Sequence, residues 1–141
     1  QTCALPIFLG AWSLQAYDLE FQDSGEHRPA LGAHPRGSLV LTPEGRIVVY
    51  LEDGDRKAPT TDAERAEAYK GLLAYAGTYT VDGNRWTTRV DGAWNVAWVG
   101  TQQVREFTIE GDRLTVVAQW NPNPLYANRQ TRGRLVFTRM R

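Results

Sequence analysis

The sequence predicts a mainly β protein: an eight-stranded, up-and-down antiparallel β-barrel with one α-helix between the third and fourth strands. Three observations support this fold. Short runs with alternating apolar and polar residues recur along the chain, glycine-containing turns separate them at hairpin spacing, and one segment has the spacing of an amphipathic helix. About eight strands joined mostly by hairpins would leave exposed edges, which closure into a barrel removes. Such a barrel has room for one small ligand.

The composition supports one domain. The 141 residues would give each of two domains too few residues for a core of ordinary size. Sixteen basic and sixteen acidic residues give a formal net charge of zero, so no surplus positive charge favours phosphate backbones or anionic lipids. No apolar run reaches the roughly 18 residues that a membrane span needs. We therefore expect neither nucleic acid nor a membrane as a partner.

The first seven residues, QTCALPI, match the in-frame translation of a common sequencing adapter. We therefore expect residues 1–7 to be a non-native leader and residues 8–141 to be the single barrel domain. Cys3 is the only cysteine, so neither an intrachain disulfide nor a cysteine-based zinc site is expected. Because the native start would be missing, localisation stays open, with the cytoplasm favoured.

The strands can be placed in order from their turns. A long strand comes first, three hairpins follow, and one strand ends the chain. The expected strands are 8–21, 37–42, 46–52, 77–81, 85–91, 101–109, 113–120 and 132–140. The hairpin turns are Pro43-Glu44-Gly45, Asp82-Gly83-Asn84 and Glu110-Gly111-Asp112.

One helix is expected between the third and fourth strands. Thr61 and Glu64 have the spacing of a capping box. Ala66, Tyr69, Leu73 and Ala76 then recur on one helical face, with charged residues opposite, and Gly77 can end the helix. We expect this amphipathic helix to lie over the sheet.

Gly10-Ala11-Trp12 resembles the Gly-x-Trp motif that opens the first strand of lipocalins, and Arg139 stands where lipocalins place an arginine over that tryptophan. Over positions 9–139 the chain is similar to the bacterial lipocalin-like domain family. Further matching stretches are Arg36-Gly37-x-Leu39, Tyr75-Ala76-Gly77-x-Tyr79-x-Val81-Asp82-Gly83, Trp98-Val99-Gly100-Thr101-x-x-x-Arg105-x-Phe107 and Gly111-Asp112-x-Leu114. The resemblance implies a calycin-like barrel but no particular reaction, because most members of the family have no assigned activity. Thr88 and Leu41 depart from its pattern, which often has His and Tyr there.

Strand alternation predicts which side chains face the interior. Tyr79 belongs to the inward set of 77–81, as do Trp86 and Thr88 in 85–91 and Trp120 in 113–120. In 101–109, the apolar face of Phe107 and Ile109 extends to Gln103 and Arg105. In the first strand, the face of Trp12, Leu14 and Ala16 leads to Asp18 and Glu20, unless a β-bulge resets it.

Arg105 is the main candidate for a binding residue. An arginine inside an apolar barrel keeps its proton and therefore needs an anionic partner. That partner can be the carboxylate or enolate oxygen of a ligand, held by paired hydrogen bonds. It can equally be Asp18 or Glu20 in a permanent ion pair, or Arg105 can lie on the surface.

Asp18 and Glu20 are the candidate catalytic residues. A carboxylate among aromatic rings in the pocket can act as a general acid or base. The alternative is a solvated carboxylate near the end of a long strand that leaves the barrel.

The chain has five Trp and six Tyr, more than packing of this barrel requires. Rigid aromatic rings bind flat, partly apolar molecules at little entropic cost. The expected ligand-binding residues are Arg105, Gln103, Trp86, Thr88, Tyr79, Trp98, Trp120, Phe107 and Tyr126. Trp98, Trp120 and Tyr126 lie in or beside connections and would rim the pocket.

The sequence therefore predicts a protein that binds a small hydrophobic or aromatic molecule with a polar or anionic end. The alternative is a cofactor-independent isomerase, cyclase or hydrolase that uses Asp18 or Glu20 as proton carrier and Arg105 as oxyanion donor. No cofactor is expected. No metal site is expected either, because His27 and His34 lack a second ligand at metal-binding spacing. A homodimer remains an open alternative to a monomer.

Overall fold

The computed structural model describes residues 7–141. The predicted leader therefore lies outside the described residues, except for Ile7, which is exposed. The strands are β1 (Gly10–Phe21), β2 (His27–Pro29), β3 (Pro35–Leu41), β4 (Arg46–Asp53), β5 (Leu72–Asp82), β6 (Arg85–Ala93), β7 (Gln102–Glu110), β8 (Arg113–Ala118), β9 (Asn121–Asn123) and β10 (Arg129–Arg139). The helix α1 (Asp62–Lys70) follows β4, and two 3-10 helices, η1 (Val96–Trp98) and η2 (Pro124–Tyr126), follow β6 and β9.

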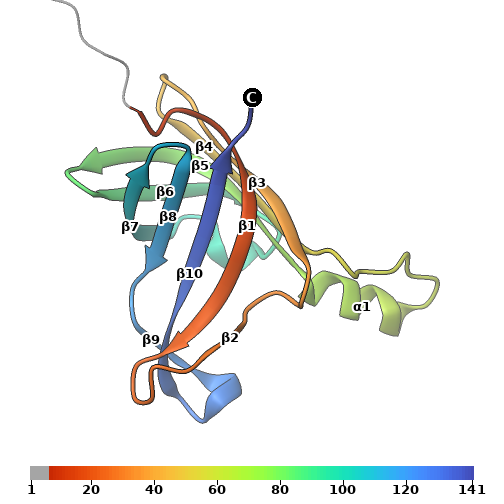
Figure 1. The fold of residues 1–141 in the computed structure, drawn as a ribbon. Helices are drawn as coiled ribbons and strands as arrows, with labels where there is room; N and C mark the ends of the chain where they lie inside the picture. Colours follow the sequence, from red (N-terminus) through yellow and green to blue (C-terminus); the bar gives the residue numbers. More distant parts are fainter. Residues whose placement is uncertain (1–6) are drawn as a thin grey trace, which may run out of the picture.

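Eight of these strands form a closed antiparallel barrel in the order β1-β3-β4-β5-β6-β7-β8-β10, with β10 pairing back onto β1 (Figure 1). The predicted barrel is thus confirmed. Two short strands were not predicted: β2 pairs with β1 beside Asp18 to Glu20, and β9 pairs with β10 near its start. Both lie at the end of the barrel where β1 finishes, here named the Phe21 end. The opposite end is named the Trp12 end.

The Trp12 end is sealed by aromatic and cationic side chains. Trp12 is completely buried, and its Nε1 donates a hydrogen bond to the Phe8 carbonyl oxygen at 2.9 Å. The guanidinium carbon of Arg139 lies 4.2 Å from the centre of the Trp12 ring, and Arg139 Nη1 donates to the Leu9 carbonyl oxygen at 2.8 Å. The ring of Phe8 packs edge-on against Tyr79 and Phe107. Ring packing and cation–π contacts therefore close the base of the barrel.

A β-bulge at Gln15 changes which residues of β1 face inward. Leu14 pairs with Phe137, but the next pair is Ala16 with Val136, so Gln15 is an extra residue in β1. Side chains alternate between the two faces of a strand, and one extra residue exchanges the faces beyond it. Trp12 and Leu14 point into the barrel before the bulge, and Tyr17 does so after it.

The helix begins where predicted but ends earlier and stands away from the sheet. The Thr61 hydroxyl accepts a hydrogen bond from the Glu64 amide at 3.1 Å, which confirms the N-terminal cap. The helix ends at Lys70, has no buried residue, and projects from the barrel (Figure 1). The predicted apolar stripe is incomplete, because Leu73 and Ala76 belong to β5. The expectation that the helix covers the sheet is therefore wrong.

The helix α1 has nine residues and is far shorter than a membrane-spanning helix. No other helix of the described chain is long and apolar enough to cross a bilayer.

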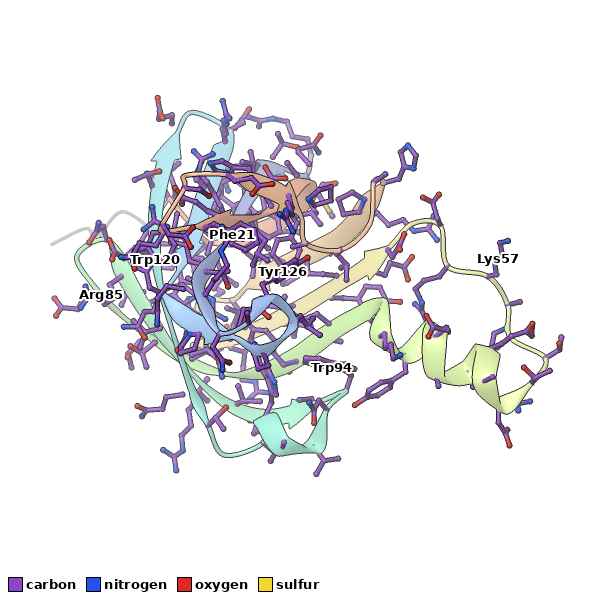
Figure 2. The ribbon with its side chains drawn as sticks, turned by 90° about the horizontal axis from the view of Figure 1, so that it is seen from below. Phe21, Lys57, Arg85, Trp94, Trp120 and Tyr126 are labelled. Atoms are coloured by element: carbon purple, nitrogen blue, oxygen red, sulfur yellow. The ribbon has the colours of Figure 1, made fainter. Side chains whose placement is uncertain are left out.

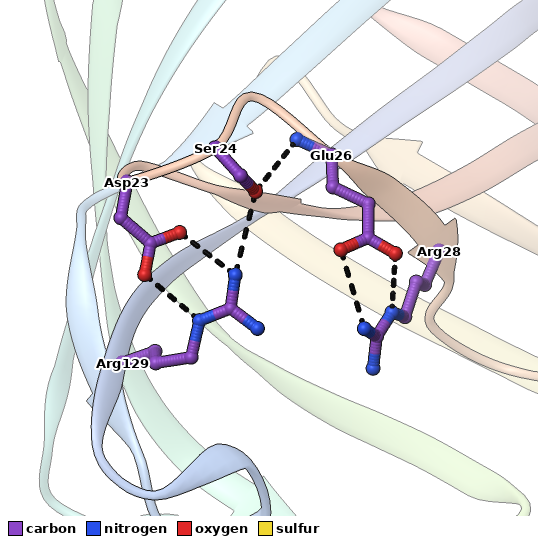
Figure 3. Close-up of polar contacts among 5 residues, drawn as sticks. All are labelled: Asp23, Ser24, Glu26, Arg28 and Arg129. Carbon is purple, nitrogen blue, oxygen red and sulfur yellow. Dashed lines mark hydrogen bonds and ion pairs between the residues drawn. The ribbon is translucent and has the colours of Figure 1, made fainter.

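The Phe21 end carries a cap of two aromatic rings, packed edge to face, and two guanidinium groups. The ring centres of Phe21 and Tyr126 lie 5.0 Å apart. Figure 2, seen from this end, labels both residues. Arg129 lies 4.2 Å and Arg28 4.9 Å from the centre of the Phe21 ring. Arg129 is held by two hydrogen bonds to Asp23, at 2.8 and 2.7 Å (Figure 3). These contacts fasten η2 and the start of β10 to the turn after β1.

A carboxylate with two arginine partners joins β3, β4 and the segment before α1. Glu52 is 9% exposed and accepts hydrogen bonds from Tyr50 Oη at 2.6 Å and Arg56 Nη1 at 3.0 Å, as well as one from Arg36 Nε. The bonds from Tyr50 and Arg36 hold the pKa of the Glu52 carboxyl below its usual value. Glu52 thus stays ionised and joins three segments of chain.

Replacing Glu52 with glutamine should lower the free energy of unfolding at pH 7 by about 1–3 kcal/mol, because hydrogen bonds to a charged group are lost. The folded-state pKa of Glu52 is depressed, so its stabilisation is present above the unfolded-state pKa and is lost as pH falls through the folded-state pKa. In urea unfolding, the difference between wild type and Glu52→Gln should shrink on acidification below pH 4.5, the ordinary glutamate pKa. A difference that grows with acidification would contradict this account.

Candidate ligand pocket

A cavity lies inside the barrel, in the part nearer the Phe21 end. Its volume is ≈ 390 Å³ when the space open to solvent is included, and only ≈ 40 Å³ of it can hold the centre of a water-sized sphere. One water needs about 10–15 Å³ on that second measure, so the space as it stands holds about three waters, and a larger molecule requires lining side chains to move. The lining residues are Tyr17, Leu39, Val49, Leu51, Leu73, Tyr75, Trp86, Arg105, Val116, Leu135 and Phe137.

Arg105 is in this cavity without a carboxylate partner. It lies on β7, opposite Trp86 of β6. Its Nη1 donates to the Val104 carbonyl oxygen at 3.0 Å, and its Nη2 donates to Gln103 Oε1 at 3.3 Å. Within residues 7–141, no acidic oxygen lies within 4.0 Å of its guanidinium. Of the partners considered for Arg105 from the sequence, the internal ion pair with Asp18 or Glu20 is therefore not formed.

Two buried tyrosines share the cavity with Arg105. Burial raises the pKa of the Tyr17 and Tyr75 hydroxyls above the usual value, and the positive charge of Arg105 opposes the shift in both. Both hydroxyls are therefore protonated at neutral pH and can donate hydrogen bonds. Gly133 faces the Tyr17 ring, where a Cβ atom would lie 3.1 Å from Cε1, so glycine at that position leaves room for the ring.

Two further donors on β6 have no partner. The indole Nε1 of Trp86 and the hydroxyl of Thr88 are buried, and neither has a hydrogen bond within the described part of the chain. Both residues lie on the inward face, as predicted, with 2% and 0% of their surfaces exposed. A buried donor without a partner costs about 1–3 kcal/mol. The barrel wall beside Arg105 therefore contains unsatisfied hydrogen-bonding capacity.

The other predicted binding residues have different surroundings. Gln103 supports Arg105, and Phe107 stacks on Trp86 at 4.9 Å. Tyr79 donates to the Thr42 carbonyl oxygen at 2.8 Å near the Trp12 end, and Trp98 packs on Tyr75 at 5.3 Å. None of these four residues lines the cavity.

Trp120 and Tyr126 are also outside the cavity lining. The Trp120 ring lies 4.3 Å from the guanidinium of Arg132, and Tyr126 belongs to the cap at the Phe21 end. Figure 2 shows the two residues at separate places around that end.

Asp18 and Glu20 do not line the cavity, which corrects the extrapolated alternation of β1. Beyond the bulge at Gln15, Tyr17 takes the inward position and Asp18 and Glu20 lie on the opposite face. Glu20 accepts a hydrogen bond from Arg132 Nε at 2.7 Å across the strand pair. The sequence carries no signal for the position of the bulge, so Tyr17 was not among the predicted site residues. Tyr75 lies four residues before Tyr79 on β5, so strand alternation places both on the inward face. Tyr75 could therefore have been predicted as a site residue from the sequence.

These features define a class of protein: a closed β-barrel with one end sealed by Trp12 and Arg139 and a small interior cavity toward the other. A comparison with sequence families finds that the lipocalin-like domain matches residues 9–140. The chain therefore belongs to the lipocalin-like domain family, which confirms the resemblance. A search of curated proteins finds no match. A barrel of this family is suited in general to binding a small hydrophobic ligand.

Proposed function

We propose that the protein binds one small hydrophobic or aromatic molecule and holds its polar or anionic end on Arg105. The observation that carries the proposal is the Arg105 guanidinium on the wall of a barrel cavity, with no carboxylate oxygen of residues 7–141 within 4.0 Å. Such a group is costly to bury without an anion, and a ligand that supplies one offsets this cost. The apolar side chains around it would hold the rest of the molecule.

The size of the cavity limits the ligand. Only ≈ 40 Å³ can hold the centre of a water-sized sphere, so lining side chains would move to admit a ring, and a single ring with a short polar head requires less movement than a long acyl chain. The flat faces of Trp86 and Tyr75 favour a planar molecule. The connection between β2 and β3 carries Leu31, which is buried in the main core. A larger ligand would have to displace this connection.

The proposal is tested by calorimetric titration of the full chain with cinnamate and with cinnamamide, which have similar shapes but differ in charge. Arg105→Met should weaken cinnamate binding at least about tenfold, since charge-assisted hydrogen bonds contribute about 1.5–3 kcal/mol, and should leave cinnamamide binding nearly unchanged. Arg85→Met is the matched control, because Arg85 is at the β5–β6 turn and outside the cavity lining. Equal binding of cinnamate to wild type and Arg105→Met would refute the assignment.

A further inference from the structure

The cavity brings together hydrogen-bond donors from three separate strands. Tyr17 comes from β1, Tyr75 from β5 and Arg105 from β7. A void of this size keeps polar groups on its wall close to one another. The remaining lining residues are apolar except for the indole N–H of Trp86, so among residues 7–141 no carboxylate or imidazole lines the cavity with the three donors. The polar part of the cavity can therefore accept negative charge but offers no base.

Two of the three donors, Arg105 and Tyr75, are held in place before any ligand arrives. Arg105 is fixed by Gln103 Oε1 and the Val104 carbonyl oxygen, and Gln103 in turn donates to Thr101 Oγ1 at 3.0 Å. The Tyr75 ring packs against Trp98. Donors that are already oriented stabilise a localised negative charge without reorganisation when it forms.

We infer that the head of the ligand is a single negatively charged oxygen, that of a phenolate or an enolate, held jointly by Tyr17, Tyr75 and Arg105. This inference rests on the proposed function and narrows it to one ligand class. Donors from three directions suit one oxygen that carries the whole charge. A phenolate oxygen is attached directly to the ring, so it also needs less room than an aromatic carboxylate. When the ligand arrives as the neutral phenol or enol, its O–H bond breaks, the oxygen keeps the electron pair and the proton passes to solvent water.

The test uses para-nitrophenol, whose phenolate absorbs visible light, and para-nitroanisole, which has the same ring but cannot ionise. Absorbance titration against pH with the full chain should show that the phenolate binds at least about tenfold more tightly than the phenol, lowering the apparent pKa of the bound phenol by at least about one unit. Para-nitroanisole should bind at least about tenfold more weakly than the phenolate.

Variants then assign the effect to the three donors. Arg105→Met should abolish the pKa shift of bound para-nitrophenol, and Tyr17→Phe and Tyr75→Phe should each reduce it. Arg85→Met should leave the pKa shift intact. Thermal unfolding checks that each variant is folded. If Arg105→Met does not fold, the two tyrosine variants, which lose only a hydroxyl, provide the same test.

Two results would overturn the inference. The first is that bound para-nitrophenol ionises with the same pKa as in solution. The second is that para-nitrophenol fails to bind while cinnamate binds. In both cases the proposed function survives. If neither cinnamate nor para-nitrophenol binds, the proposed function fails as well.

Discussion

Replacing Gly77 with alanine should lower the free energy of unfolding by at least about 3 kcal/mol. A Cβ atom at Gly77 would lie 2.0 Å from the Arg89 carbonyl oxygen and 2.8 Å from its carbon, both in the backbone of the neighbouring strand β6. Backbone atoms cannot move aside without breaking the pairing of β5 with β6. Because Tyr75 lies two residues away on β5 and lines the cavity, ligand binding should weaken as well. Urea unfolding followed by tryptophan fluorescence measures the loss.

Gly92 provides the matched control for Gly77. It lies on β6 opposite Ala76, and a Cβ atom there would have no other atom within 4 Å. Gly92→Ala should therefore change stability by no more than about 0.5 kcal/mol. If both substitutions have the same effect, contact with the Arg89 carbonyl is not what requires glycine at position 77.

Replacing Trp12 with alanine should destabilise the protein by about 3–5 kcal/mol, the range for removing a large buried aromatic side chain. Trp12 has no exposed surface, and its loss also leaves the Phe8 carbonyl oxygen and the Arg139 guanidinium without their contact at the sealed end. Arg139→Lys should cost less, about 1 kcal/mol, because the charge stays while the planar group over the ring is lost. Thermal and urea unfolding give both values.

Trp120→Ala tests whether burial, rather than any loss of tryptophan, accounts for the effect at Trp12. Trp120 is half-buried and its ring contacts Arg132 outside the cavity, so its removal should cost no more than about 1 kcal/mol. Similar losses for Trp12→Ala and Trp120→Ala would show that the sealed end contributes no special stability.

The barrel could be predicted because its signals are local. Turns such as Asp82-Gly83-Asn84 determine where a hairpin reverses, and alternation then places Trp86 and Thr88 on the inward face, where the structure has them. The same logic placed Arg105 in the cavity, since the pairing of β7 with β6 contains no bulge between Arg85 and Arg89. Regular pairing preserves the alternation that the sequence displays.

The parts that could not be predicted depend on contacts between distant segments. The bulge at Gln15 is determined by the pairing of β1 with β10, which lie at opposite ends of the sequence, so Asp18 was expected inside instead of Tyr17. The end of α1 at Lys70 depends on Leu73 joining the β4–β5 pairing. The size of the cavity depends on how all eight barrel strands pack, which no single segment reveals.

The bulge at Gln15 decides whether Tyr17 or Asp18 faces the interior of the barrel. Deleting Gln15 while keeping the pairing with β10 would remove the bulge and leave Tyr17 inward, whereas pairing Gln15 with Val136 without a bulge would turn Asp18 inward in place of Tyr17 and put a carboxylate where Arg105 has none. The carboxylate and the Arg105 guanidinium would then neutralise each other, and the proposed anionic ligand would lose its partner. In this scaffold, a one-residue change in the pairing of β1 with β10 exchanges a phenol for an acid on the inner wall of the barrel.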